Sequence, residues 1–368
     1  MIKGLYIHIP FCRNICSYCD FCKLVAKPEL IDNYLQSLAT ELGHVRSLLD
    51  MIETIYIGGG TPTSLSAPAF GRVLKMITNN LNTRTITEYT VEANPEDIDY
   101  SRASLMRDAG VTRVSLGVQT FDMDIRQHMH RKHGFATIKK AVDILRDFDF
   151  DINIDMIYGY PGQSIDSVNN DLELLLKLDP AHVSYYQLIL EEKTELGYLV
   201  RKGVLFLDED QVFEQGKLVN LRLEKAGLRR YEISNYARPG REAKHNLLYW
   251  NLEEYLGIGL GAASQYGHRR YHNPDRISDY LNQVLEFGHP LETVEEFEPE
   301  KETIILGLRL VEGISLTAFE KRFGSSPFTL FPGLRKHLDN GLLELRGTRL
   351  RLTDRGLDLA NQVFLVVI

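Results

Sequence analysis

The sequence predicts an α/β protein: a full or partial parallel β/α barrel followed by a small C-terminal domain of winged-helix-like α+β type. Three observations support this fold class. Strand-like and helix-like segments alternate six times from the start of the chain, which is typical of a parallel sheet with helical crossovers. The expected strands end in polar or glycine-rich residues, where barrels of this kind carry their chemistry. Helices around a single hairpin follow at the end of the 368-residue chain.

Each of the six expected strands contains a short β-rich run, and each is followed by a segment of helical periodicity. The strands are expected at residues 5–9, 54–57, 87–93, 113–118, 151–158 and 183–190. The helices are expected at residues 30–49, 67–79, 101–108, 122–128, 136–148, 164–178 and 208–226. Right-handed crossovers repeated in one direction curl such a sheet toward a barrel.

The chain is expected to divide into a barrel at residues 1–235, a connecting region at 236–295 and a C-terminal domain at 296–368. The connecting region contains a glycine-rich stretch at 257–264. This stretch matches a nucleotide-binding fingerprint only loosely, and we interpret it as close backbone packing. The region runs into an acidic segment, 292–302, which we interpret as a linker.

The C-terminal domain is expected to be built from helices around one hairpin. The helices are expected at residues 304–310, 316–323, 331–340 and 354–363, and the hairpin strands at 342–345 and 349–352 around Gly347. The apolar end, 363–368, is expected to dock on the domain or to form an edge strand. Winged helices often bind DNA, but basic residues here are concentrated only in 346–355, so a packing or lid role is favoured.

Composition and charge exclude several classes of protein. An apolar fraction of 44% is enough for a packed core. The formal charge is 42 − 50 = −8, which argues against a nucleic-acid binder because such proteins need a basic surface. We expect no signal peptide, and no apolar run reaches the roughly 20 residues that a membrane span needs. Clustered free cysteines without a secretion signal indicate a reducing cytosol.

All four cysteines, Cys12, Cys16, Cys19 and Cys22, lie within eleven residues. The first three have the spacing C-x3-C-x2-C, which favours an iron–sulfur cluster held by thiolates. Three thiolates on a [4Fe–4S] cluster leave one iron open for a small molecule. A zinc site usually needs a second pair of ligands further away, and a disulfide between such close neighbours would stabilise little. The role of Cys22 stays open: it is either a thiol that does not bind the cluster or a ligand that replaces one of the other three in some state.

The cysteine loop with Tyr18 and Asp20-Phe21, the segment 58–63 and the order of βα units resemble the radical S-adenosylmethionine superfamily. Within it they resemble the branch of oxygen-independent coproporphyrinogen III dehydrogenase and its haem-chaperone relatives. The resemblance covers nearly the whole chain. It implies a [4Fe–4S] cluster on Cys12, Cys16 and Cys19, with S-adenosylmethionine chelating the open iron. One electron from the cluster can then split the sulfonium to methionine and a 5′-deoxyadenosyl radical.

The resemblance also implies residues that contact the methionine part of this cofactor. Tyr6 matches a tyrosine that contacts it, and Glu92 matches a cofactor-binding glutamate that can accept hydrogen bonds. Gly59, Gly60 and Thr61 match the segment that binds the methionine amino group. Glycine in such a segment lets backbone carbonyls approach a ligand closely.

A second set of matched residues lies further along the chain. Gln119 matches a glutamine near the sugar, and Asp155 matches an aspartate for the ribose hydroxyls. Arg131 matches an arginine for the methionine carboxylate, a bidentate pairing that suits a guanidinium group. Leu188 matches a residue that lines the adenine.

Two departures separate the chain from the dehydrogenase and predict that this activity is lacking. Phe21 stands where the dehydrogenase has a fourth cysteine, and Tyr6 lies so near the start that its N-terminal extension is expected to be absent. Residues 245–250 match the H-N-x-x-Y-W motif of the haem chaperones, whose histidine is associated with haem. Imidazole is a common axial ligand of haem iron, and Tyr249 and Trp250 can shelter a porphyrin face. The alternative is that His245 is a hydrogen-bonded histidine over the barrel mouth.

The sequence therefore predicts a cytosolic haem chaperone that binds haem, a [4Fe–4S] cluster and S-adenosylmethionine. Haem would pass to respiratory haem proteins, with peripheral membrane contact where the recipients lie there. The first alternative is oxygen-independent coproporphyrinogen III dehydrogenase, acting by radical oxidative decarboxylation. The second is a winged-helix regulator that senses redox state. The sequence leaves open whether S-adenosylmethionine is cleaved, and whether the chain is a monomer or a homodimer.

Overall fold

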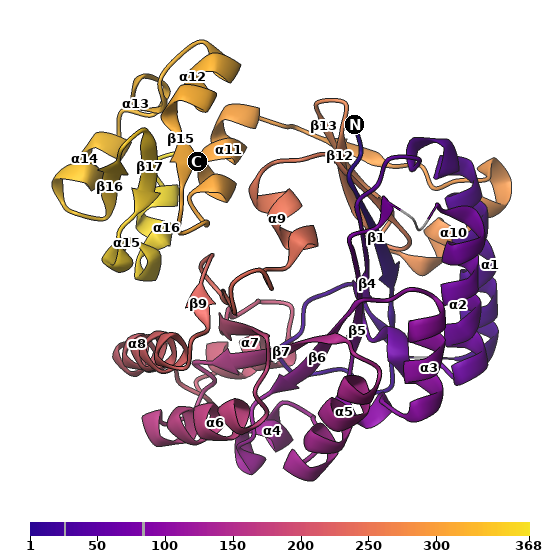
Figure 1. The fold of residues 1–368 in the computed structure, drawn as a ribbon. Coiled ribbons are helices and arrows are strands. Elements are labelled where there is room, and N and C mark those ends of the chain that lie inside the picture. The colour runs from indigo at the N-terminus through magenta and orange to yellow at the C-terminus, as the bar shows by residue number, and fades with distance from the viewer. Residues whose placement is uncertain (26, 83–84) are drawn as a thin grey trace.

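The structure is a computed structural model that describes residues 1–25, 27–82 and 85–368. Its centre is one large curved sheet with helices on the outer side (Figure 1). In sheet order the strands are β14 (Thr293–Glu295), β13 (Arg269–His272), β12 (Ala263–Tyr266), β11 (Tyr255–Ile258), β1 (Gly4–Ile9), β4 (Thr54–Gly59), β5 (Glu88–Ala93), β6 (Arg113–Gln119), β7 (Asp151–Tyr158), β8 (His182–Gln187), β10 (Asn235–Ala237) and β9 (Arg229–Arg230).

The expected parallel barrel is confirmed in its partial form. The strands from β11 to β8 pair in parallel, and the strands beyond them at both ends of the sheet pair antiparallel. Within the described residues the sheet keeps two separate edges, β14 and β9, so the barrel is open. The carboxyl ends of the parallel strands therefore meet along one rim.

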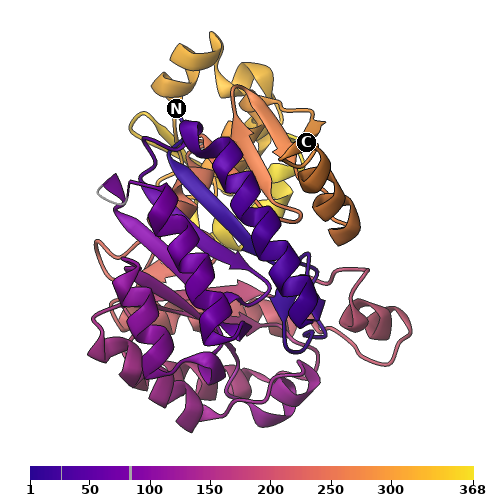
Figure 2. The ribbon, with the colours of Figure 1, turned by 90° about the vertical axis from the view of Figure 1, so that its right-hand side faces the viewer.

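The outer face of the sheet is covered by helices that follow the strands in sequence (Figures 1 and 2). They are α1 (Pro28–Val45), α2 (Ala67–Asn80), α3 (Tyr100–Asp108), α4 (Met123–His128), α5 (Phe135–Asp147), α6 (Ile165–Lys177) and α8 (Glu209–Lys225). The short α7 (Glu195–Arg201) lies instead beside the cysteine loop, where the Leu196 N–H donates to the Ser17 carbonyl. Local sequence sets several of their starts. Asp99, for example, accepts a hydrogen bond from the Arg102 N–H at 2.7 Å and caps α3.

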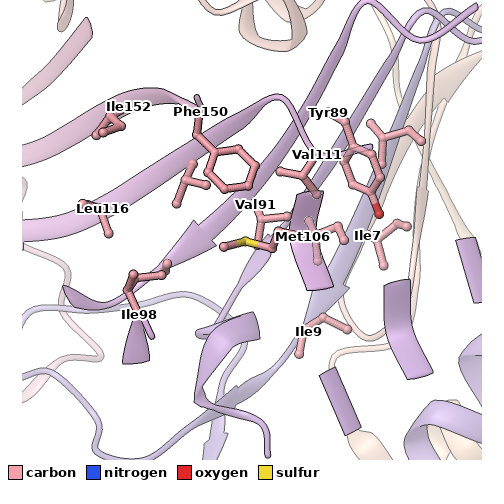
Figure 3. Close-up of a cluster of buried hydrophobic side chains, with 14 of the residues drawn as sticks. Ile7, Ile9, Tyr89, Val91, Ile98, Met106, Val111, Leu116, Phe150 and Ile152 are labelled. Carbon is pink, nitrogen blue, oxygen red and sulfur yellow. The ribbon is translucent and has the colours of Figure 1, made fainter. Parts of the chain in front are cut away.

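Side chains alternate along the strands, so that one face of the sheet is apolar and the other is polar. Ile7 and Ile9 of β1 lie in the buried layer beneath the helices, together with Val91 of β5 and Met106 of α3 (Figure 3). Tyr6, the residue before Ile7, points to the opposite, concave face because side chains alternate along a strand. Burial of the apolar layer holds the helices on the sheet, and the concave face is left for polar and aromatic residues.

Residues 236–295, which we expected to connect the two domains, also extend the large sheet. β11 returns to pair with β1, and β12 to β14 continue the sheet as a meander beside α10 (Ile277–Phe287). The interpretation of the glycine-rich stretch as close backbone packing is confirmed. A Cβ atom on Gly257 would lie 2.1 Å from the Ala263 carbonyl oxygen, and one on Gly259 would lie 2.7 Å from the His8 carbonyl oxygen. The interpretation of 292–302 as a linker is wrong, since it contains β14 and the start of a helix, α11 (Pro299–Gly307).

The C-terminal domain is a small α+β unit with its own hydrophobic core. Its helices are α11 (Pro299–Gly307), α12 (Leu316–Phe323), α13 (Pro327–Leu330), α14 (Leu334–Asp339), α15 (Asp354–Asp358) and α16 (Ala360–Phe364), and its strands are β15 (Ile314–Ser315), β16 (Leu343–Arg346) and β17 (Arg349–Leu352). The hairpin around Gly347 is confirmed. The single helix expected at 354–363 is divided at Leu359, and Val367 is buried, so the chain end docks on the domain.

Two short strands, β2 (Phe11–Cys12) and β3 (Leu24–Val25), pair in parallel at the ends of the cysteine loop. Across residues 1–25, 27–82 and 85–368, no helix combines the length and apolar character needed to cross a membrane.

Candidate cluster and cofactor site

The cysteine loop is held at the carboxyl rim of the sheet by hydrogen bonds to neighbouring segments. The Leu24 N–H donates to the Pro10 carbonyl at 2.6 Å, which closes the loop at its base. Ser17 anchors its middle, because its hydroxyl donates to the His128 carbonyl at 2.8 Å and its carbonyl accepts the Leu196 N–H at 2.9 Å. All four thiols are free, so the loop is shaped without the disulfide that we considered.

The three expected ligand cysteines share this loop but differ in exposure. Cys12 is buried, with its Sγ 3.9 Å from the Thr61 hydroxyl, while Cys16 and Cys19 are half-buried. Burial raises the pKa of Cys12 to about 11 and also raises the pKa of Cys19. Thiolates bind metals, so a cluster must displace these protons. Among the described residues no group of three His, Cys, Asp or Glu is arranged around a single ion. Because a four-iron cluster is larger than one ion, its thiolate ligands would lie further apart than the ligands of a single ion do.

Residues 59–61 lie at the end of β4 and pack against the segment that leads into Cys12. The Gly60 N–H donates to the Ile9 carbonyl at 2.8 Å, and the Thr61 N–H donates to the Phe11 carbonyl at 2.9 Å. A Cβ atom on Gly60 would lie 2.8 Å from the Phe11 carbonyl oxygen. Gly59 has a φ of 112°, which favours glycine. This close approach positions the cysteine loop against the end of β4.

Glu92, near the end of β5, is a half-buried carboxyl group on the concave face. It accepts hydrogen bonds from the Tyr56 hydroxyl at 2.7 Å and from the Gly59 N–H at 3.2 Å. Burial, followed by the nearby charge of Asp155, raises its pKa to about 7. Glu92 can therefore be protonated or ionised near neutral pH, and a cationic ligand would favour the ionised form.

Arg131 joins the cysteine loop to the ends of β5 and β6. Its guanidinium donates to the Asn94 amide oxygen at 2.5 Å, to the Gly117 carbonyl at 3.3 Å and to the Tyr18 hydroxyl at 3.3 Å. Its Nε is buried and has no hydrogen-bond partner among the described residues. A carboxylate is the natural partner for such a donor, so Arg131 fits the carboxylate role that the resemblance implies.

Gln119 and Asp155 complete the polar rim. Gln119 has a φ of 71° at a register shift between β6 and β7, an uncommon conformation for a residue other than glycine. Asp155 accepts from the Ser115 hydroxyl and from the Asn153 amide, both at 2.7 Å, and burial raises its pKa. The Asp155 carboxylate is thus held in place by two residues of the sheet, as a ligand site requires.

Tyr6 and Leu188 lie on opposite sides of this rim. The Tyr6 hydroxyl is 2.9 Å from Nδ1 of His8, whose Nε2 is 2.7 Å from the Cys22 carbonyl oxygen. Burial lowers the pKa of His8, so the ring is neutral. Leu188 packs in a small apolar cluster that contains Met129, and Tyr18 packs against the same cluster.

His245 is fully buried at the start of α9 (Lys244–Trp250). Its Nδ1 is 2.7 Å from the Thr54 hydroxyl and its Nε2 is 2.7 Å from the Tyr249 hydroxyl, so neither ring nitrogen is free. Glu88 accepts the backbone N–H groups of Lys244 and His245, both at 2.9 Å, and fixes the start of α9 on β5. Burial lowers the pKa of His245 to about 3, which keeps the imidazole neutral.

A groove of about 360 Å³ lies beside the cysteine loop, between the concave face and α11. We call it the aromatic groove. Its walls include the aromatic residues Tyr6, Phe21, Tyr249, Trp250 and Tyr255, together with His8, Cys22, Gln265, Arg270 and Leu306. The groove therefore joins the H-N-x-x-Y-W helix, the fourth cysteine and the C-terminal domain.

Sequence reasoning named most of the rim but missed residues that hold it together. Asn94 contacts both Arg131 and the Thr61 hydroxyl, and it directly follows β5 in Glu92-Ala93-Asn94, a position typical of functional polar residues. Tyr56 and the groove residue Gln265 had no such local signal. They are brought to the site only by the pairing of distant strands.

Comparison with known proteins agrees with this geometry. The family model described as the radical SAM superfamily matches residues 6–175, and that of the HemN C-terminal domain matches residues 298–359. An open parallel barrel with three clustered cysteines at its carboxyl rim is thus the fold of a radical SAM protein.

The relatives define the family more narrowly. A protein named heme chaperone HemW from Bacillus subtilis (strain 168) is 37% identical over 372 residues, which cover 99% of this chain and 98% of that protein. A protein of the same name from Lactococcus lactis subsp. lactis (strain IL1403) is 38% identical over 366 residues, which cover 98% of this chain and 96% of that protein. The chain belongs to the HemW family of the radical SAM superfamily.

A solved structure shares the fold. Coproporphyrinogen III oxidase (HemN) from Escherichia coli, described as a radical SAM enzyme, has a TM-score of 0.86 and 22% identity, covering 100% of this chain and 90% of that one. Membership of the superfamily implies a [4Fe–4S] cluster and S-adenosylmethionine, which together supply one-electron cleavage chemistry when bound. The buried Nε of Arg131, which has no hydrogen-bond partner in the described part of the chain, and the three free thiols fit these groups.

Proposed function

We propose that the protein is a haem chaperone that binds haem together with a [4Fe–4S] cluster and S-adenosylmethionine. The observation that carries the proposal is the aromatic groove beside the cysteine loop, in a chain 37% identical to a protein named heme chaperone HemW. Haem passes from this protein to respiratory haem proteins. It acts in the cytosol, reaches membrane-bound recipients by peripheral contact, and has no nucleic-acid partner.

The groove has the chemistry that a haem molecule needs. Aromatic side chains such as Trp250 and Tyr255 offer flat apolar surface to a porphyrin face. Gln265 is only 5% exposed, and no hydrogen bond from its amide is recorded within the described part of the chain. Its amide can donate to a propionate at the porphyrin edge, and Arg270 lies in the same wall.

His245 reaches the haem iron through this groove only after Tyr249 moves. Tyr249 lies in the groove wall and holds the Nε2 of His245. If Tyr249 turns away, Nε2 faces the space that it leaves. The low pKa of His245, about 3, keeps the ring in the neutral state that ligates iron. The lost hydrogen bond between His245 and Tyr249 costs on the order of 1 kcal/mol.

The rim of the barrel holds the other two groups. Cys12, Cys16 and Cys19 hold the cluster, and Arg131 binds the carboxylate of S-adenosylmethionine. The remaining cofactor contacts are Tyr6, Gly59, Gly60, Thr61, Glu92, Gln119, Asp155 and Leu188. Residues 59–61 and Glu92 lie at the carboxyl ends of β4 and β5. Tyr6 and Asp155 lie within β1 and β7, and Arg131 follows α4.

Haem titration of two variants tests the role of His245. His245→Ala removes the imidazole, so we expect at least about 10-fold weaker haem binding and loss of the imidazole-ligated absorption spectrum. Tyr249→Phe removes only the hydroxyl that holds Nε2, so we expect haem binding to be kept or strengthened. The exposed His44→Ala is the matched control and should bind haem like the parent protein.

Two outcomes would count against these assignments. Unchanged haem affinity and spectrum in His245→Ala would remove His245 from the site. Formation of protoporphyrinogen from coproporphyrinogen III would overturn the chaperone proposal in favour of the dehydrogenase. That assay uses cluster-loaded protein with S-adenosylmethionine and a reductant, without oxygen.

A further inference from the structure

One wall of the aromatic groove comes from the C-terminal domain. Leu306 of α11 lines the groove, and α11 is the first helix after the large sheet ends at β14 (Figure 1). One turn before Leu306, Glu302 pairs with Arg270 of β13. Just beyond the helix, Arg309 packs on Trp250. Residues three or four apart lie on the same side of a helix, so α11 covers the groove with one side.

Arg270 is the only lysine or arginine that lines the aromatic groove in the part of the chain that the structure describes. Its guanidinium is already engaged by Glu302. One terminal nitrogen donates to Oε1 of the carboxylate at 3.1 Å, and the other donates to Oε2 at 3.2 Å. This bidentate pairing is strong and occupies the end of the guanidinium. The two side chains are 26% and 23% exposed, so a ligand in the groove can reach the pair.

Haem carries the same chemical group that Glu302 presents to Arg270. Its two propionates are carboxylates at one edge of a flat apolar ring. A haem whose ring packs on the aromatic walls is held best with its propionates at the polar part of the groove, beside Gln265 and Arg270. Exchange of one carboxylate for another keeps the charge-assisted hydrogen bonds of Arg270. Burial of the porphyrin face then favours the haem-bound side of the exchange.

We propose that Glu302 is an internal competitor of haem: a haem propionate displaces it from Arg270 and thereby frees the N-terminal end of α11. The inference rests on the haem binding of the proposed function and adds how loading and release are controlled. Arg309 stays on Trp250, so the C-terminal domain remains attached while the start of α11 opens. When Glu302 returns to Arg270, the propionate loses its partner and haem is released.

Haem binding and closure of α11 therefore oppose each other. Such a coupling between two events is reciprocal, so each weakens the other by the same factor. The exchange can be followed from both sides, as an effect of haem on α11 and as an effect of Glu302 on haem affinity.

Two probes and two variants test the exchange. The probes are ferric haem and haem dimethyl ester, which has the same ring and iron but no carboxylate. Glu302→Gln removes the competing charge. Glu344→Gln is the matched control, because it breaks an arginine–glutamate pair with Arg351 on the hairpin of the C-terminal domain. Absorption titration measures the binding of each probe, and trypsin cleavage after Lys301, near the start of α11, measures the opening of that helix.

We expect haem to speed cleavage after Lys301 in the parent by about 5-fold or more, the size of an ordinary coupling between two sites. The dimethyl ester should bind without this effect, since it cannot pair with Arg270. Glu302→Gln should be cut quickly with or without haem, and by reciprocity it should bind haem about 5-fold more tightly than the parent. Its affinity for the dimethyl ester should equal that of the parent, and Glu344→Gln should behave like the parent throughout.

Haem binding with unchanged cleavage after Lys301 would overturn the inference, because the propionate would then leave the Arg270–Glu302 pair intact. Equal opening by haem and by its dimethyl ester would also overturn it, since the ring alone would then displace α11. Both results come from the parent protein, so they decide the question even if Glu302→Gln is unstable. If neither probe binds, the proposed function fails and the inference falls with it. Titration reports that failure, and cleavage reports the other.

Discussion

At the scale of single residues, Arg131 shows how one side chain joins segments that are distant in sequence. It donates to Asn94 after β5, to Gly117 in β6 and to Tyr18 in the cysteine loop. A Cβ atom on Gly117 would lie 3.2 Å from the Gln119 amide nitrogen, and at an ordinary contact distance of 3.5 Å from both the Arg131 guanidinium and the Asn94 amide oxygen. The loop that carries the cysteines is thus tied to the sheet by a planar group with several donors.

Arg131→Lys should weaken S-adenosylmethionine binding by about 10-fold or more while leaving the cluster in place. A lysine keeps the charge but has one nitrogen, so it cannot serve the protein acceptors and a bound carboxylate together. Calorimetric titration of cluster-loaded protein with S-adenosylmethionine measures the effect. Arg107→Lys, at an exposed position in the last turn of α3, is the control. Unchanged affinity in Arg131→Lys would rule out the carboxylate role.

His245 shows where a motif and a fold give different information. The motif marks the residue, but only the fold shows that its ring is fully buried between Thr54 and Tyr249. The partners come from β4 and from the next turn of its own helix. The contact with Thr54 could not be predicted because the two residues lie far apart in sequence. The burial that lowers the pKa of the His245 ring likewise follows from tertiary packing.

At the scale of elements, Glu41 of α1 links three parts of the sheet extension. Its carboxylate accepts from the Gly259 N–H at 2.9 Å, the Asn273 amide at 2.7 Å and the Tyr280 hydroxyl at 2.5 Å. These partners lie after β11, after β13 and on α10. Burial raises the pKa of Glu41 to about 7 despite these three donors. The carboxyl group therefore holds its proton more tightly in the folded than in the unfolded chain.

This raised pKa predicts a pH-dependent effect of Glu41→Gln. The stability that comes from the tightly held proton is fully present below about pH 4.5 and is lost as pH rises through about 7. The change amounts to about 3 kcal/mol at most. Urea unfolding at pH 5 and pH 8 should therefore show a larger advantage of the parent over Glu41→Gln at pH 5.

A constant difference between parent and variant at both pH values would show that Glu41 is ionised in the fold over this range. Glu29→Gln, at an exposed position in the first turn of the same helix, serves as the control and should show no such pH dependence.

At the scale of the whole molecule, the C-terminal domain is fastened to the barrel around Trp250. The Arg309 guanidinium lies 4.4 Å from the centre of the Trp250 ring, and one of its nitrogens lies 3.4 Å from the carboxylate of Glu232. Glu232 is fully buried, so this cation is its charge partner. Because Trp250 also lines the aromatic groove, docking of the domain and the shape of the groove are linked.

Arg309→Met should loosen this attachment and destabilise the protein by about 2 kcal/mol, because Glu232 is left buried without its cation. Limited proteolysis should cut the variant faster between the two domains, and its haem affinity should fall with the loss of order at Trp250. Arg346→Met, on an exposed strand of the C-terminal domain, is the control. Parent-like proteolysis and haem binding in Arg309→Met would separate the domain interface from the groove.

The sequence by itself determined the parallel β/α sheet, the cysteine loop and the polar residues near the strand ends, because these depend on local signals. It left open whether the barrel is full or partial, which the structure decided. Alternating βα segments, cysteine spacing and polar residues at strand ends are all visible within short windows of sequence. β11 was missed because a short glycine-rich strand has little local signal, and its partner β1 lies at the other end of the chain.

Only the tertiary structure decided which side chains share a site and which are buried. It placed Tyr249 between His245 and the aromatic groove, and it paired Arg270 in the groove wall with Glu302 of α11. The physical reason is that grooves, desolvation and ion pairs depend on contacts between distant segments. Local periodicity predicts the segments, and packing alone decides what they enclose.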